Sequence, residues 1–141
     1  MHRAVLDSSV LVSAFLTPRG TSAELLRAAE RGLFVLCVSD EIIAETTRSL
    51  RQKTRRIRRY YPNYSDVEID RYAEMIALTA EMVAGLPALR VVPLDPKDDV
   101  IVATAVKAQA DYLVTGDRHL LALGSHGSIE MITPRQFLDL L

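Results

Sequence analysis

The stretch at residues 94–117, LDPKDDVIVATAVKAQADYLVTGD, carries the pattern that decides the fold. Its alanine-rich part, VIVATAVKAQA, predicts a helix, and the apolar run YLVT at 112–115 predicts a strand that ends at Gly116 and Asp117. The N-terminal run AVL at 4–6 also ends in an aspartate, Asp7. Two strand-like segments far apart in the sequence therefore each carry a carboxylate where the chain leaves the core.

Strand-like runs and helical patterns alternate along the rest of the chain. Because strands separated by helices pair in parallel, this order predicts an α/β fold, with a parallel-stranded sheet of about five strands and helices on both faces. The strands are expected at 4–6, 33–38, 90–94, 112–115 and 128–132.

Capping signals set the expected helix boundaries. TSAE and SDVE are capping boxes, in which a hydroxyl caps the helix and a glutamate three residues later reaches back. The expected helices are 21–31 from the box TSAE to Gly32, 39–59 from Ser39 to the turn before Pro62, 66–84 from the box SDVE, 100–110, and a closing helix from Thr133-Pro134.

Length and composition fit one globular domain over residues 1–141. Of the 141 residues, 49% are apolar and 25% are charged, and the formal net charge is -1. No apolar run approaches the ~18 residues of a membrane span, and Asp7 interrupts the apolar part of a would-be signal peptide. The single cysteine, Cys37, lies in an apolar run and fits a reducing compartment, so we expect a cytoplasmic protein that makes no membrane contact.

Four acids are expected to converge at one edge of the sheet. Ligands of an open parallel sheet bind at the carboxyl ends of the strands, where Asp7, Asp99 and Asp117 follow the first, third and fourth strands. Glu45 flanks the apolar face of the helix after the second strand and can reach over the same edge. Such carboxylates repel one another unless a cation is present, and Mg²⁺ or Mn²⁺ suits carboxylate and water ligands. An ion held there would activate a water and stabilise charge on a phosphodiester.

Each acid also has an ordinary structural interpretation. Asp7 can cap the helix that follows it, and Asp117 in TGD can be a turn residue. Asp98 and Asp99 can both be first-turn acids favoured by the helix dipole, and Glu45 can be a solvated helix residue. The conjunction of three strand-end acids in one α/β domain favours a metal site over these interpretations.

The sequence resembles the PIN domain, and in particular the toxin-like ribonucleases of VapBC-type toxin–antitoxin pairs. The resemblance implies a PIN-like α/β/α sandwich and covers nearly the whole chain in the family's order. It rests on VLDSSVLVSAFL at 5–16, SDEIIAETTRSL at 39–50, LDPKDDVIVATAVKAQADYLVTGDRHLL at 94–121 and ITPRQFLDLL at 132–141.

Carried over residue by residue, the resemblance implies roles for the acids. Asp7, Glu45, Asp99 and Asp117 correspond to the family's four acids, which are both catalytic and metal-ligating. The doublet at 98–99 leaves open which aspartate is the third ligand. Asp99 is favoured because it directly precedes VIVATA, with Asp98 as a helper or a cap.

Two hydroxyl residues match positions that orient ligands or water in the family. Ser9 lies two residues after the first acid, and Thr115 precedes the glycine and the final acid.

The resemblance implies a metal-dependent endoribonuclease that cuts single-stranded or loop RNA with the help of one or two Mg²⁺ or Mn²⁺ ions. Relatives commonly dimerise, and toxin members are held inactive by a small antitoxin whose tail occupies the acidic groove. We therefore expect an RNA substrate, a cognate antitoxin protein and a homodimer.

A basic stretch, RSLRQKTRRIRRYYPNY at 48–64, contains seven cations and no acid. At helical spacing five of its six arginines share one face, which is a candidate phosphate track. The tyrosines behind it could stack on bases, but they are more typical of packing residues. The same pattern also fits a solvated helix face or a docking surface for an acidic peptide. The arginines of this face are Arg48, Arg51, Arg55, Arg58 and Arg59.

Other functional classes compete with a nuclease. A PIN-like domain can bind RNA or protein as an inactive scaffold, but a pure binder has no need of four mutually repelling acids. A haloacid-dehalogenase-type phosphatase needs D-x-D after the first strand, where this chain has DSS. The sequence does not separate a toxin from a housekeeping RNA-processing nuclease.

Overall fold

The computed structural model describes residues 1–92 and 95–141, and this part of the chain forms an α/β fold. Its elements, in chain order, are β1 (Arg3–Leu6), α1 (Ser8–Leu16), α2 (Thr21–Glu30), β2 (Val35–Ser39), α3 (Asp40–Thr54), the 3₁₀ helix η1 (Pro62–Tyr64), α4 (Asp66–Thr79), β3 (Glu81–Val83), α5 (Pro96–Ala108), β4 (Tyr112–Val114), α6 (Arg118–Leu123), β5 (Ser125–His126), β6 (Ile129–Ile132) and α7 (Pro134–Leu138).

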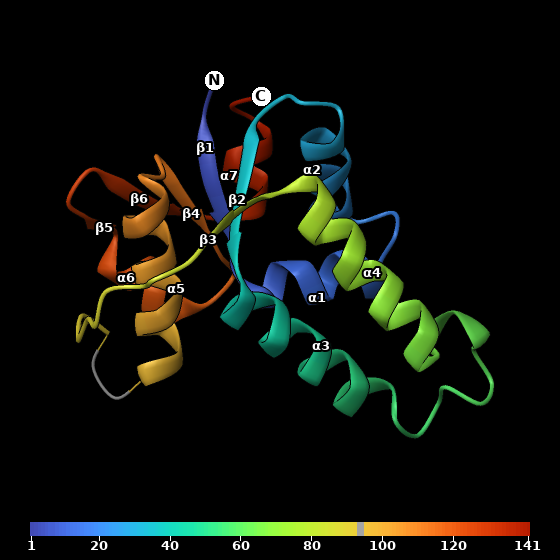
Figure 1. Ribbon diagram of the computed structural model, residues 1–141. Coiled ribbons are helices and arrows are strands. Elements are labelled where there is room, and N and C mark those ends of the chain that lie inside the picture. The colour runs from blue at the N-terminus through green and yellow to red at the C-terminus, as the bar shows by residue number, and fades with distance from the viewer. Residues whose placement is uncertain (93–94) are drawn as a thin grey trace.

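Within the described residues, six strands form one sheet in the order β3-β2-β1-β4-β6-β5 (Figure 1). Neighbouring strands pair in parallel, except that β5 pairs antiparallel with β6. The central strand β1 places Ala4 opposite Leu36 of β2 and Tyr112 of β4. The predicted α/β fold is confirmed; the sheet was expected to be parallel with about five strands, and it has six strands, of which β5 is antiparallel.

Helices flank the sheet on both sides. Helix α5 packs along β1, β2, β3 and β4, whereas α2 and α7 lie together on the other side of β1 and β2 (Figure 1). The larger of two apolar clusters among the described residues joins these layers through buried residues such as Leu25 of α2, Val102 of α5 and Leu113 of β4. Such helix–sheet–helix packing leaves the ends of the strands as the accessible part of the sheet.

The parallel register brings the carboxyl ends of β1 and β4 to the same edge. Leu6 pairs with Val114, and the backbone N–H of Asp7 donates to the carbonyl of Val114 at 2.9 Å. The next residue of β4, Thr115, donates its N–H to the carbonyl of Ile132. The two segments that carry Asp7 and Asp117 are therefore fixed side by side before any side chain is considered.

Two helices end earlier than the sequence predicts. Helix α3 ends at Thr54 rather than at Arg59, and the N–H groups of Ile57 and Arg58 turn back to the carbonyl of Thr54. Successive arginines at helical spacing repel one another, which weakens a continued helix. Helix α4 ends at Thr79 rather than at 84, because the chain then pairs with β2 as the edge strand β3.

Neither of the two predicted capping boxes forms in full. Thr21 does not cap α2, because Gly20 occupies the N-cap without a side-chain hydrogen bond. Ser65 does cap α4 by accepting from the N–H of Glu68, although the Glu68 carboxylate pairs with Arg71 instead of reaching back. The closing helix α7 begins as predicted, with a full capping box at Thr133.

The strand predicted at 90–94 is wrong over residues 90–92, and residues 93–94 lie outside the described part of the chain. The N–H groups of Val91 and Val92 donate instead to one carboxylate oxygen of Asp99, each at 2.8 Å. Helix α6 and strand β5 were not predicted, because each is too short to show a periodic pattern.

We expect Phe137→Ala to destabilise the protein by about 3–5 kcal/mol, because the fully buried ring closes the C-terminal end of the core against Phe34 and Tyr112. Urea unfolding followed by circular dichroism measures this loss. The exposed Leu140→Ala serves as the control and should change the unfolding free energy by less than about 0.5 kcal/mol. Equal stability of both variants would contradict the proposed packing of α7.

Candidate active site

Asp7 is fixed at the end of β1 by contacts on both carboxylate oxygens. Oδ1 accepts from the N–H of Ser9 at 3.4 Å and from the hydroxyl of Ser8 at 3.2 Å, so the side chain caps α1. Oδ2 accepts a short hydrogen bond of 2.7 Å from the Thr115 hydroxyl. The residue is only 3% exposed. Asp7 therefore caps α1, which was its ordinary structural interpretation, and it is also a buried acid at the edge of the sheet.

Thr115 links the two strand-end acids. Its hydroxyl donates to Asp7 and accepts from the backbone N–H of Asp117 at 2.9 Å. The side chain is fully buried, so neither contact exchanges freely with water. The orienting role expected for Thr115 stays a prediction. Ser9 contacts Asp7 through its backbone N–H, and no hydrogen bond of its hydroxyl is found within the described residues.

Three carboxylates gather at this edge. Asp95 and Asp117 are the N-caps of α5 and α6, and Asp98 lies in the first turn of α5. One oxygen from each of the three lies within 4.8 Å of the others. They line a cavity of about 310 Å³ together with Asp7 and Glu45. The helix starts thus deliver acids to the same place as the strand ends.

Asp98 is the least satisfied member of the group. Its side chain is only 5% exposed, and Oδ2 is buried with no hydrogen-bond partner among the described residues. Burial, and then the neighbouring carboxylates of Asp117, Asp95 and Asp7, raise the pKa of Asp98 to about 7. A buried carboxylate oxygen without a donor, beside two further carboxylates, is a set that fits a hard divalent cation.

The structure corrects the choice between the two aspartates of the doublet. Asp99 was favoured as the acid of the site, but its carboxylate accepts from the N–H groups of Val91 and Val92 and lines a different cavity. Asp98 faces Asp95 and Asp117 instead. Neighbouring helix residues point about 100° apart, so only one of the two can face the sheet edge.

A sequence signal for Asp98 exists in the periodicity of α5. Asp98 lies three, four and seven positions before Ile101, Val102 and Ala105, which are all buried. This is the spacing of one helix face, and it puts Asp98 on the side that packs against the sheet.

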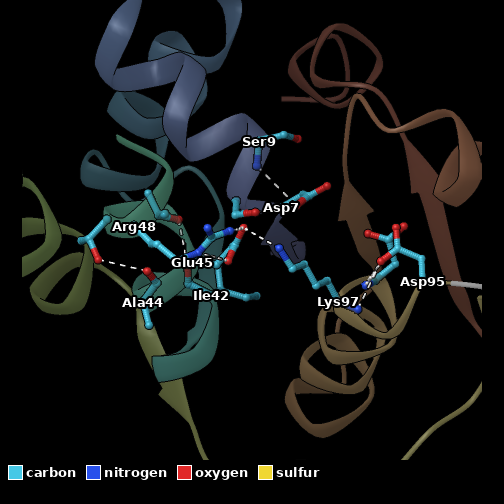
Figure 2. A network of polar contacts seen from close by, with 12 residues as sticks. Asp7, Ser9, Ile42, Ala44, Glu45, Arg48, Asp95 and Lys97 are labelled. Atoms are coloured by element: carbon cyan, nitrogen blue, oxygen red, sulfur yellow. Dashed lines mark hydrogen bonds and ion pairs between the residues drawn. The ribbon is translucent and has the colours of Figure 1, made fainter. Parts of the chain in front are cut away.

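Glu45 lies at the rim of the cavity, and it is not one of the three acids whose oxygens gather. Figure 2 shows its carboxylate between Arg48 and Lys97. Two hydrogen bonds from Arg48, at 2.7 and 3.1 Å, lower the pKa of Glu45, and Lys97 at 3.7 Å adds to this effect. Glu45 therefore stays ionised.

The sequence prediction missed three charged residues of the site: Asp95, Glu41 and Lys97 all line the cavity. Asp95 accepts from the N–H groups of Lys97 and Asp98 at 3.2 and 3.3 Å. The pair Asp95-Pro96, with an acid before a proline, is a typical helix start, and it could have been assigned as the cap of α5.

The basic face predicted for α3 is largely neutralised. Arg48 pairs with Glu45, and both Arg51 and Arg58 pair with Asp66 of α4. The end of α3 at Thr54 also means that Arg55, Arg58 and Arg59 do not continue one helix face. Their role in binding nucleic acid stays a prediction.

The chain belongs to the PIN domain family. The PIN domain model matches residues 3–119, a span that includes every acid of the cavity described above. PIN domains are generally nucleases, and an acidic cluster is present here. No curated protein matches the sequence. Across the described residues, none of the helices has the length and apolar character that a membrane crossing requires.

The raised pKa of Asp98 predicts how the stability of the metal-free protein depends on pH. The folded pKa of about 7 exceeds the ordinary value of 3.8, so the folded state holds a proton that the unfolded state releases between these values. The free energy of unfolding should therefore fall by roughly 2–4 kcal/mol between pH 4 and pH 7. Asp98→Asn should lack this part of the fall. Urea unfolding in chelator at several pH values measures it, and identical pH profiles for both proteins would contradict the burial of an unpartnered carboxyl.

Proposed function

We propose that this PIN domain is a metal-dependent endoribonuclease that cuts single-stranded or loop RNA. The observation that carries the proposal is the buried Asp98, whose unpartnered oxygen lies beside the carboxylates of Asp95 and Asp117. A cluster of this kind is costly without a cation. Its presence in a chain of a nuclease family supports a hydrolytic site.

Asp95, Asp98 and Asp117, with Asp7 beside them, would hold Mg²⁺ or Mn²⁺. When bound, the ion lowers the pKa of a coordinated water and stabilises negative charge on the phosphodiester. The chain's own part is to fix the acids. Thr115 holds Asp7 and the Asp117 backbone in one arrangement, and the helix caps fix Asp95 and Asp117.

Glu45 and Lys97 complete the rim of the proposed site. The lowered pKa of Glu45 makes it a carboxylate at neutral pH, which suits it to hold a cation or orient water rather than to give up a proton. The exposed ammonium group of Lys97 lines the cavity beside the acids, where it can meet an RNA phosphate.

The biological setting is also part of the proposal. The resemblance to VapBC-type toxins supports a toxin that a cognate antitoxin inhibits and that forms a homodimer. The single buried Cys37 supports a reducing compartment such as the cytoplasm. A housekeeping RNA-processing nuclease would use the same site without an antitoxin.

Cleavage of an end-labelled, structured RNA tests the proposed activity. We expect cuts with Mg²⁺ or Mn²⁺ and none in chelator, and we expect Asp7→Asn and Asp98→Asn to lower the rate by more than about 100-fold. Asp99→Asn is the matched control, because its remaining side-chain oxygen can still accept from Val91 and Val92, so it should cut at nearly the wild-type rate.

Loss of cleavage in Asp99→Asn together with full activity in Asp98→Asn would overturn the site assignment. RNA that binds but is never cut, with any divalent ion and no co-purified inhibitor, would favour the inactive scaffold.

A further inference from the structure

The turn that follows α3 carries cations that have no carboxylate partner. We call residues 53–61 the hairpin tip; they comprise the last two residues of α3 and the turn that leads toward η1 and α4. The exposed cations there that make no ion pair with any described residue are Lys53, Arg55, Arg56 and Arg59. No acid occurs between Thr46 and Ser65 in the sequence. The hairpin tip is therefore a local concentration of positive charge on a chain whose net charge is -1.

The hairpin tip also presents aromatic rings. Tyr60 and Tyr61 are 68% and 54% exposed. The guanidinium of Arg59 lies over the Tyr60 ring, 5.1 Å from its centre. The Tyr61 ring lies 5.6 Å from Tyr64 between centroids, so this exposed ring is held against a second ring. Exposed rings beside unpaired arginines form the surface on which single-stranded nucleic acid stacks its bases and places its phosphates.

A groove connects the acidic cavity to the hairpin tip. It has a volume of about 500 Å³ and runs between α1 and α3. Ser8, Ser9 and Glu45 line both the groove and the acidic cavity, so the two are continuous. Its lining also includes Ser13, Ser49 and Lys53. Beyond the groove, Tyr64 contacts Phe15 near the end of α1, with 5.9 Å between ring centroids. The tyrosines therefore gather at the end of the groove that is farther from the acids.

We propose that the hairpin tip is a second contact site for the RNA substrate, and that the strand reaches it from the acids along the α1–α3 groove. This inference rests on the proposed function. Glu45 and Arg55 are ten positions apart, of which α3 covers all but the last, so the path is about 15 Å long. This length corresponds to roughly four stacked nucleotides. A stacked RNA of three nucleotides spans only about 10 Å, so it can occupy the acidic cavity but stops short of the arginines of the hairpin tip. Bases can stack on the tyrosines with little sequence preference.

Binding of fluorescein-labelled RNA, measured by anisotropy in chelator over a range of salt concentrations, tests this path without requiring cleavage. The cation variant is Arg56→Gln with Arg59→Gln, and the aromatic variant is Tyr60→Ala with Tyr61→Ala. The matched control is Arg31→Gln with Lys107→Gln, which removes two exposed cations at the ends of α2 and α5.

For a twelve-nucleotide RNA, the plot of log affinity against log salt should be less steep in the cation variant, its negative slope being smaller in magnitude by about 1.4. This difference corresponds to the loss of two phosphate contacts. The aromatic variant should bind this RNA about fivefold or more weakly. Both variants should bind a three-nucleotide RNA as the wild type does, and the control should match the wild type with the long RNA. Because the cations of the hairpin tip are exposed and unpaired, the cation variant is expected to fold even where the tyrosine changes disturb the packing of Tyr64.

An unchanged salt slope in the cation variant, or a wild-type protein that binds no RNA, would overturn the inference. The inference would also fail if the cation variant lost binding of a polyglutamate peptide but kept its binding of RNA. That result would make the hairpin tip a docking site for an acidic protein. If the cation variant cleaves the long RNA at the wild-type rate at subsaturating protein concentration, the proposal of a second contact site is wrong, whereas the proposed nuclease activity is supported. If RNA binding depends on the hairpin tip but no RNA is ever cut, the proposed nuclease activity is wrong, whereas the proposal of an RNA contact site at the hairpin tip is supported.

Discussion

The hydrogen bond from the Thr115 hydroxyl to Asp7 is the contact on which the site depends most. It joins the ends of two neighbouring parallel strands, at 2.7 Å and out of reach of solvent, and the same hydroxyl accepts from the Asp117 backbone. The parallel pairing of β1 with β4 makes the contact possible, because it brings residues more than a hundred positions apart to one edge of the sheet. Asp7 and Asp117, which follow these two strands, are therefore held at the same edge of the sheet.

Much of this arrangement can be predicted from the sequence, because it follows from the strands. The strand-end positions of Asp7 and Asp117 follow from apolar runs that stop at an acid, and a parallel sheet brings such ends together. The choice between Asp98 and Asp99 depends on the rotation of α5 against the sheet, which the doublet alone does not reveal. The third strand was predicted at 90–94 instead of at β3. Because β3 is a three-residue edge strand with little burial, no alternation of apolar and polar residues marks it in the sequence.

The distribution of charge separates two parts of the molecule. Acids gather at the strand ends, whereas seven cations and no acid occur in the stretch 48–64. Three of the arginines in that stretch are paired: Arg48 with Glu45 inside α3, and Arg51 and Arg58 with Asp66 of α4. Such exposed pairs contribute little stability individually. A helical prediction that groups five of the six arginines on one face misses this division, because the division depends on which acids of α4 lie opposite α3. The unpaired cations remain in the last turn of α3 and in the segment that follows it.

The most direct test of the metal site is calorimetric titration of Mn²⁺ into the metal-free protein and into Asp98→Asn and Asp99→Asn. We expect the wild type and Asp99→Asn to bind the ion alike, and we expect Asp98→Asn to bind it at least about tenfold more weakly. This result would assign the ion to the side of α5 that carries Asp98, which faces Asp95 and Asp117. Equal binding by all three proteins, or a loss confined to Asp99→Asn, would contradict the assignment of Asp98 as the central acid.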